Sequence, residues 1–480
     1  MFERGLRLLD GKYKRLMSNT MLFAISNFSS KLLSIILQPY ITFAMGEVDE
    51  VGITKLVQQI GSLLIPLVSM GVSFAIIRFG LERTNDKRKV FTNGFVTILM
   101  GFGLMVICYP LLRLIPLFSS YAILLYVHVL VSCMRTLCTQ FIRSRQLNRL
   151  VAVDGVLCSA TNLGFMILFL SGMHLGAEGY VLALICSDAL SAIFVFLVAG
   201  LRRYLHWYSF DPKMWKKMMC YALPMVPAQI SFWIINASSL FFVQAMCEGY
   251  QSQTGEYWTG LLSVGSFLPT ILTVLGTIFY EAWQLSAVTE EHEREVFFSR
   301  VFSIYQALLF CCCSGIVLLC RPLMFLFKSN FYDAWQFVPM LTLGTLFNCF
   351  NQFLNSIYML EKRSTLSLYT MMVGAVANCI LAWALIPLVG PNGATFASMV
   401  SYILVFILRA MNTRKLLRLN FAPARLMFNC TLIGIETVIM LTAAPYWAVW
   451  CTIITVVICL FNMQSILAML KQLLGRRKRA

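Results

Sequence analysis

Charged residues are scarce in this chain of 480 residues, and histidine is scarcer still. Asp, Glu, Lys and Arg together make up 12% of the sequence, and there are four histidines. No Gly-Lys-Ser phosphate-binding loop, no Gly-x-Ser-x-Gly motif and no metal-type spacing of Cys and His is present. No hydrophilic stretch is long enough to house nucleotide hydrolysis. We therefore predict no enzymatic activity, no cofactor and no metal site.

Hydrophobic runs take the place of these features. Hydrophobic residues make up 59% of the chain, and its mean hydropathy is +0.77. The runs are about as long as a bilayer crossing and lack the alternation of barrel strands, so the spans must be helices. We predict an all-α polytopic membrane protein with about fourteen transmembrane helices. These lie near 17–44, 53–80, 90–112, 119–142, 151–171, 177–200, 219–246, 257–283, 297–319, 333–359, 365–389, 393–411, 425–443 and 446–470.

The basic residues between these spans predict the orientation. By our count, 31 of the 38 Lys and Arg fall on alternate loops, starting with the N-terminus and including 409–425. The positive-inside rule then places both termini in the cytoplasm. Orientation and anionic lipid headgroups also account for the net charge of +17, so no nucleic-acid partner is expected.

The chain also repeats itself weakly. Asn162 to Gly179 corresponds to Asn378 to Gly393, with the loops at Gly176 and Gly390 at an offset of 214 residues, and Pro66 matches Pro269 at an offset of 203. Two parallel six-helix lobes, as in transporters that rock around a central site, would explain these matches. Pro66 and Pro269 would be hinges or static kinks. We predict an N-terminal lobe at 1–201, a cytoplasmic linker at 202–217, a C-terminal lobe at 218–412, and a helix pair with a basic tail at 413–480.

A lysine lies near the middle of the first predicted span. Lys31 shares one helix face with Asn27, Ser30, Ser34 and Gln38, at helical spacing. A cation at that depth costs about 3 kcal/mol unless it faces a partner or water. The face predicts an aqueous pocket that attracts anions. Snorkelling to an interface, or pairing inside the bundle, is the alternative.

Other spans carry polar stripes of the same kind. Span 53–80 includes Gln59 in such a stripe, span 219–246 carries two further amides, and span 333–359 carries four on one face. Amides suit sugar hydroxyls or water, although interhelical hydrogen bonds would explain one or two of them. The predicted glycan-lining residues are Asn27, Gln38, Gln59, Gln229, Asn236, Asn348, Asn351, Gln352 and Asn355.

Embedded charges complete the predicted site. Arg78 and Arg135 accompany Lys31 within spans of the N-terminal half, and the three together suit a phosphate or diphosphate. Arg78 is alternatively an interfacial anchor. Among the embedded acids, Asp188 and Glu281 would carry H⁺ or Na⁺, or would only neutralise a cation.

These residues resemble the polysaccharide-transporter family of the multidrug/oligosaccharidyl-lipid/polysaccharide (MOP) superfamily. Two stretches carry the resemblance: Ser18-Asn19-Thr20 to Lys31-Leu32-Leu33-Ser34 with Gln38-Pro39-Tyr40-Ile41-Thr42, and Val51-Gly52 through Pro66-Leu67-Val68-Ser69-Met70-Gly71 to Ile77-Arg78-Phe79. Lys31 matches the lysine of the family's opening motif, and Arg78 matches its arginine in the second span.

The resemblance implies a flippase in a bacterial plasma membrane. It would move an undecaprenyl-diphosphate-linked oligosaccharide outward by alternating access, for capsule, O-antigen or exopolysaccharide assembly. Membrane lipids, a polysaccharide polymerase and glycosyltransferases would be its partners. Three alternatives stay open: a cation-coupled exporter of the same superfamily, a flippase of lipid II or of a spore-envelope precursor, and a scaffold that transports nothing.

Overall fold

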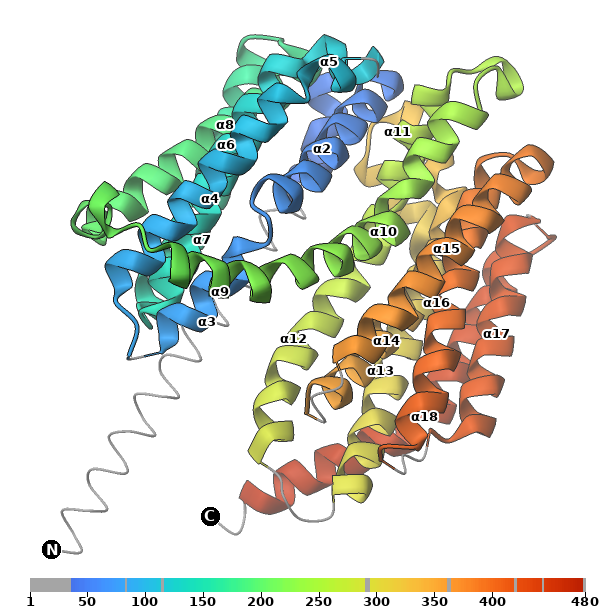
Figure 1. Cartoon of the computed structure of the whole chain (residues 1–480). Helices are drawn as coiled ribbons and strands as arrows, with labels where there is room; N and C mark the ends of the chain where they lie inside the picture. Colours follow the sequence, from blue (N-terminus) through green and yellow to red (C-terminus); the bar gives the residue numbers. More distant parts are fainter. Residues whose placement is uncertain are drawn as a thin grey trace, which may run out of the picture. The chain divides into compact units, whose positions relative to one another are not determined.

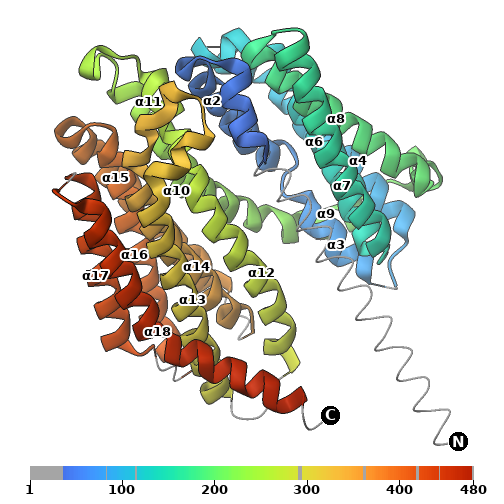
Figure 2. The same cartoon turned by 180° about the vertical axis from the view of Figure 1, so that it is seen from behind.

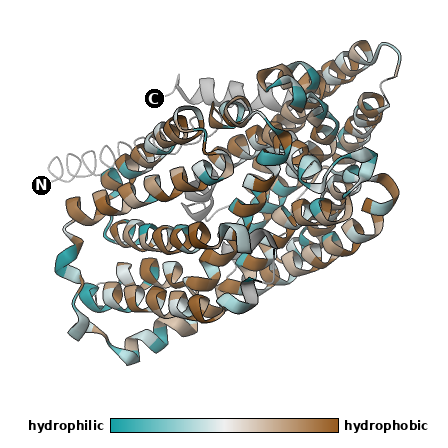
Figure 3. Cartoon of the chain, turned by 90° about the horizontal axis from the view of Figure 1, so that it is seen from above, coloured by the Kyte–Doolittle hydropathy of each residue, from teal (hydrophilic) through white to brown (hydrophobic). Residues whose placement is uncertain are grey.

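The computed structural model describes residues 36–82, 84–113, 116–289, 294–360, 364–417, 421–442 and 444–477. Every regular element in these ranges is a helix (Figure 1). Eleven described helical segments are long and apolar enough to cross a membrane, and hydrophobic residues cover most of the helical turns (Figure 3). The predicted all-α polytopic membrane protein is confirmed. The count of fourteen spans stays a prediction, because most of span 17–44 lies outside the described residues.

The chain forms two compact units, which divide between Trp233 and Ile234, inside helix α10 (Val226–Met246). The predicted boundaries at 201, 217 and 412 remain predictions. The first unit contains α2 (Val48–Val68), α3 (Val72–Leu81), α4 (Lys87–Ile107), α5 (Tyr109–Leu112), α6 (Pro116–Ser144), α7 (Asn148–Met166), α8 (Gly176–Val198) and α9 (Pro212–Ala222). The second contains α11 (Gly255–Gly265), α12 (Phe267–Thr289), α13 (Arg294–Leu323), α14 (Val338–Leu360), α15 (Ser364–Val389), α16 (Pro391–Arg414), α17 (Pro423–Leu441) and α18 (Trp447–Arg477).

Each unit has a central helix that packs on two others. In the first unit α8 packs against α6 and α7, and in the second α16 packs against α14 and α15 (Figures 1 and 2). These are the fourth to sixth and the tenth to twelfth predicted spans. The same packing pattern therefore recurs at the positions where the sequence repeats.

The repeated residues at the offset of 214 have equivalent environments. Gly176 and Gly390 both adopt positive φ, 55° and 67°, just where α8 and α16 begin. Further along, Ser187 is 1% exposed and Ser401 is 0% exposed. Glycine is the residue best suited to a left-handed backbone, and buried serine permits close helix contact. The repeat thus has a physical cause in the way each central helix starts and packs.

Two of the predicted spans are broken rather than continuous. Span 53–80 forms α2 and α3, separated at Ser69 to Gly71, where Met70 and Gly71 have positive φ. Span 257–283 forms α11 and α12, separated at Ser266. Pro66 lies in the last turn of α2, and Pro269 lies in the first turn of α12, where its missing N–H would have no helical partner. Their roles as hinges stay predictions.

The segment between α8 and α9 is attached to α4. Asn93 donates to the Asp211 carbonyl at 3.2 Å, and Trp215 Nε1 donates to Thr97 Oγ1 at 3.0 Å. Lys89 forms a 2.9 Å ion pair with Asp211, which also caps α9. The hydrogen bond from Lys89 lowers the pKa of the Asp211 carboxyl. The residues predicted as a linker therefore lead into α9, and their contacts with α4 fix where α9 starts.

Candidate functional site

The predicted anion pocket is described only in part. Lys31 and Asn27 lie outside the described residues, whereas Gln38 lies in the helix Ile36–Met45. Gln38 Oε1 accepts a hydrogen bond of 3.1 Å from Lys55 Nζ of α2. The ammonium of Lys55 also lies 3.4 Å from Gln58 Oε1 and 5.8 Å from the centre of the Tyr180 ring. All of these partners are neutral.

Gln59 continues the polar face of α2 by one turn. Its Oε1 accepts a hydrogen bond of 3.1 Å from Ser62 Oγ, and its backbone carbonyl accepts one of 3.0 Å from Trp233 Nε1. Trp233 also donates to Ser62 Oγ at 3.0 Å, so α10 is joined to this face within the first unit. Gln229, one turn earlier on α10, is half-buried. The predicted lining residue Gln59 therefore shares a face of α2 with Lys55, and Gln38 reaches Lys55 from the neighbouring helix through a hydrogen bond.

Arg78 is exposed on α3, and its guanidinium lies over the ring of Tyr221 on α9, 4.4 Å from the ring centre. A cation over an aromatic face keeps its charge and its N–H donors. Arg78 is therefore positioned by packing and remains accessible to a ligand. Its predicted contact with a diphosphate stays a prediction.

Arg135 and Asp188, which we predicted separately, are brought together. Arg135 Nη1 of α6 lies 3.1 Å from Asp188 Oδ1 of α8, and their side chains are 30% and 14% exposed. Arg135 Nε also donates to Ser191 Oγ at 2.9 Å. The pair places a positive charge and a negative charge on facing helices within the span, where each reduces the cost of the other.

A wider polar cluster surrounds this pair. Ser132 donates to Asp188 Oδ2 and lies 3.4 Å from His128 Nδ1, while Ser191 donates to Asp154 Oδ1 of α7 at 2.5 Å. We call these residues the α6–α8 cluster: His128, Ser132, Arg135, Asp154, Asp188 and Ser191. Asp188 contacts the guanidinium directly, and Asp154 is linked to it through Ser191. The cluster therefore contains two carboxyl groups and one guanidinium.

The second predicted coupling residue, Glu281, lies in α12, and its side chain is outside what the structure describes. Another acid within a span, Glu436 of α17, is completely buried. It accepts hydrogen bonds from Ser314 at 2.7 Å and Thr455 at 3.2 Å. These bonds connect α13, α17 and α18, so Glu436 stabilises the packing of the C-terminal helix pair.

The four amides of α14 differ in burial, and their predicted lining role stays a prediction. Asn351 is 2% exposed and donates to the Tyr402 carbonyl of α16 at 3.0 Å. Asn355 accepts a hydrogen bond of 2.5 Å from Ser367 of α15. Asn348 and Gln352 are half-buried. On α10, Asn236 is exposed and accepts a hydrogen bond of 2.7 Å from the Tyr402 hydroxyl.

A buried cation in the second unit was missed by sequence reasoning. Arg409, which we counted among the cytoplasmic basic residues, lies inside α16 and is 3% exposed. Its guanidinium donates to Asn351 O at 2.7 Å, Thr370 Oγ1 at 3.1 Å and Ser367 Oγ at 3.2 Å. These described acceptors are all neutral. Arg409 follows Ser401 by eight residues in the same helix, and both are buried. This helical spacing was the signal in the sequence that could have indicated burial of Arg409.

The sequence matches a family model described as polysaccharide biosynthesis protein over residues 16–279, a little more than half of the chain. The chain belongs to this family. A search of curated proteins finds no match.

Solved structures show the same fold. Lipid II flippase MurJ in an inward closed conformation matches with a TM-score of 0.70 at 14% identity, over 94% of this chain and 99% of that chain. An inward-facing multidrug resistance MATE family transporter of the MOP superfamily matches with a TM-score of 0.66 at 16% identity, over 81% and 98%. A MOP superfamily transporter from Pyrococcus furiosus matches with a TM-score of 0.57 at 16% identity, over 82% and 94%.

These findings confirm the predicted fold class and the predicted polysaccharide family. The chain is a multi-pass membrane protein with the fold of MOP superfamily transporters and flippases. The structural relatives are transporters and a flippase. At identities of 14% and 16%, these matches establish the fold and do not identify a substrate.

Proposed function

We propose that this protein is a flippase for an oligosaccharide joined to a polyprenyl carrier through a diphosphate. It would move this lipid from the cytoplasmic to the outer leaflet of a bacterial plasma membrane, with both of its own termini in the cytoplasm. The observation that carries the proposal is the combination of a polysaccharide-biosynthesis family sequence with a transporter and flippase fold. Capsule, O-antigen or exopolysaccharide assembly would use the product. A polymerase and glycosyltransferases would act beside it.

The cations of the first unit support a role in holding the diphosphate. Arg78 is exposed, Lys55 has only neutral partners among the described residues, and Arg135 keeps 30% of its side chain exposed. We include Lys31 in this set because of its depth in the predicted first span. Arginine contributes paired donors and lysine a compact charge, which together suit phosphate oxygens. The polyprenyl tail would stay in the lipid.

The α6–α8 cluster supports coupling to H⁺ or Na⁺. With Asp188 ionised, Arg135 is held by a carboxylate 3.1 Å away. A cation that neutralised Asp188 would weaken that attraction and leave Arg135 able to bind the diphosphate. Loss of the cation would restore the pair and favour release. Binding of the lipid and binding of the cation would then assist each other, as linkage requires. The two would move in the same direction, so the membrane potential acting on the diphosphate would have to drive the outward step.

Export of the glycan in a strain that lacks its own flippase tests the proposal. We expect Lys31→Ala and Arg135→Ala to abolish export while the amount of membrane-inserted protein is unchanged. Asp188→Asn should export glycan with less sensitivity to an ionophore. Wild-type export by both cation variants would refute the diphosphate site, and unchanged ionophore sensitivity of Asp188→Asn would refute the coupling role.

A cation-coupled exporter of small molecules is the second candidate. The presence of two carboxylates, Asp154 and Asp188, around one arginine favours it. Reconstituted vesicles separate the two candidates. Movement of a fluorescent lipid-linked glycan without efflux of cationic dyes supports the flippase, and the reverse result supports the exporter.

A further inference from the structure

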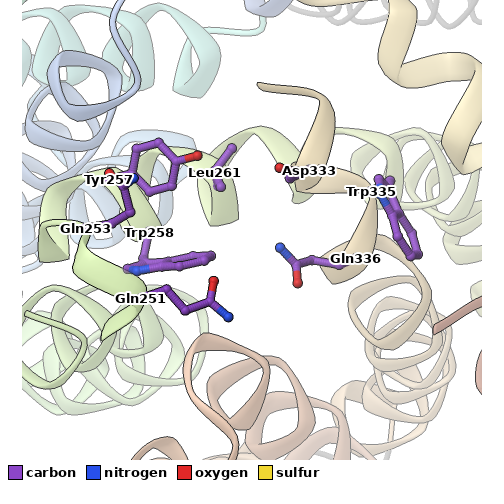
Figure 4. Close-up of a pocket in the computed structure, with 8 residues that line it drawn as sticks. All are labelled: Gln251, Gln253, Tyr257, Trp258, Leu261, Asp333, Trp335 and Gln336. Atoms are coloured by element: carbon purple, nitrogen blue, oxygen red, sulfur yellow. The ribbon is translucent and has the colours of Figure 1, made fainter. Parts of the chain in front are cut away.

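A cavity of about 310 Å³ opens in the second unit, where the loop after α10 meets the start of α11 and the 3₁₀ segment Ser329–Phe337 (Figure 4). This end of the unit lies away from the C-terminal end of α18 (Figures 1 and 2). Its volume is at the lower limit of pockets that hold small organic ligands. It is separate from the α6–α8 cluster, which belongs to the first unit.

Three aromatic side chains contribute to the wall of the cavity: Tyr257, Trp258 and Trp335. Trp258 is fixed because its Nε1 donates to the Tyr250 carbonyl at 3.1 Å. Trp335 is fixed by Arg321, whose guanidinium lies 4.0 Å from the ring centre. Rigid aromatic faces of this kind bind the apolar C–H face of a ring while its substituents hydrogen-bond elsewhere.

The polar part of the wall consists of amides and one carboxylate. The amides of Gln251 and Gln336 point into the space beside the ring of Trp258, and Asp333 lies on the same 3₁₀ segment as Gln336 (Figure 4). Each amide both donates and accepts, and the carboxylate accepts, which matches neighbouring hydroxyl groups. The described lining contains Asp333 and no Lys or Arg, so an anionic phosphate is disfavoured.

The loop that carries Gln251 is held in a strained conformation. Gln251 and Ser252 both have positive φ, 50° and 62°, although neither is glycine. Such a backbone costs about 1–3 kcal/mol per residue and persists only where the surroundings impose it. Here Gly249 N donates to Gln253 O at 2.9 Å, and Gly255 N donates to Glu248 Oε2 at 2.8 Å. The strained loop is therefore fixed at both of its ends, with Gln251 directed into the cavity.

From the aromatic faces, the paired amides and the fixed loop, we propose that this pocket binds a saccharide. The inference rests on the proposed function, because the orientation proposed above places the pocket on the outer face. It would receive the sugar part of the lipid-linked glycan after translocation. One or two sugar residues fit a cavity of this size.

Calorimetric titration of the purified full-length chain in detergent tests the pocket. The probe is the water-soluble oligosaccharide released by mild acid from the lipid-linked glycans of the source strain. The wild type should bind this oligosaccharide. Farnesyl diphosphate, which lacks sugar, is the control, and its binding should not change in the pocket variants. Asp333→Ala and Gln251→Asn, which retains a residue that tolerates positive φ, should each weaken binding of the oligosaccharide about fivefold. Ser329→Ala, an exposed position in the same 3₁₀ segment, should leave binding unchanged.

The outcomes separate this inference from the proposed function. Binding of the oligosaccharide that is weakened by the pocket variants supports the saccharide pocket, even if reconstituted vesicles show no flipping. Absence of flipping would refute the proposed flippase function and not the pocket. Flipping of the lipid-linked glycan together with no binding of the free oligosaccharide, or with wild-type affinity in both pocket variants, overturns the inference.

Discussion

The contact between Arg135 and Asp188 makes a quantitative prediction about coupling energy. Two unit charges about 4 Å apart attract each other by about 4 kcal/mol at an effective dielectric constant near 20. The Arg135 side chain is 30% exposed and that of Asp188 is 14% exposed, and desolvation opposes the attraction. We therefore expect a net coupling of about 2 kcal/mol, close to a thirtyfold change in an equilibrium constant.

A double-mutant cycle measures this quantity. Arg135→Gln and Asp188→Asn remove the charges and keep hydrogen-bonding groups beside Ser132 and Ser191, so the cycle isolates the charge interaction. The assay is reversible unfolding of each purified variant in mixed micelles with increasing denaturing detergent. The double variant should be more stable than the two single losses predict by addition, since each single variant leaves one charge of the pair without its direct partner.

A coupling below roughly 0.5 kcal/mol would refute the reasoning, because it would equal that of an ordinary surface pair. The proposed mechanism would fail with it. If the pair contributes nothing when it is formed, neutralising Asp188 cannot make Arg135 available to a ligand.

Three further predictions concern packing and pH. A methyl group added at Gly101 would lie 1.9 Å from a backbone carbonyl oxygen of α2, so Gly101→Ala should lower stability by more than about 2 kcal/mol, whereas Gly103→Ala on the same helix, with open space around it, should not. Arg409→Met should lower stability by about 3 kcal/mol, since three buried acceptors lose their donor. The Lys89–Asp211 ion pair stabilises the fold at neutral pH and should be lost as the pH falls through the lowered pKa of Asp211. Hydrogen exchange of the segment before α9 should therefore increase at that low pH in the wild type. In Asp211→Asn it should be high already at neutral pH.

Each of these predictions has an outcome that contradicts it. Equal thermal stability of Gly101→Ala and Gly103→Ala would contradict the close approach of α2 and α4. A Met variant at position 409 that melts like the wild type would show that its neutral acceptors find other donors. Exchange before α9 that does not depend on pH would indicate that hydrogen bonds from Asn93 and Trp215 hold this segment without the ion pair.

The sequence alone determined the broad architecture because a bilayer imposes strong conditions on it. A span needs about 20 apolar residues, and backbone groups in lipid must be satisfied within a helix. The helical class therefore follows from composition and run length. The repeat at the offset of 214 also followed from sequence, because Gly176 and Gly390 both adopt positive φ where equivalent helices begin. Family membership depended on the order of residues across the first two spans, which is present in the chain itself.

Only the tertiary structure decided which polar faces meet. Helical spacing places Arg135 and Asp188 on defined faces, but it contains no information on the rotation of α6 against α8, so an ion pair across 53 residues of sequence could not be predicted. Arg409 illustrates the same limit, since its position near the end of a span suggested solvent, whereas packing of α14 and α15 against α16 buries it among carbonyls and hydroxyls. Periodicity determines which side of a helix a residue occupies, and only packing between helices determines what lies opposite.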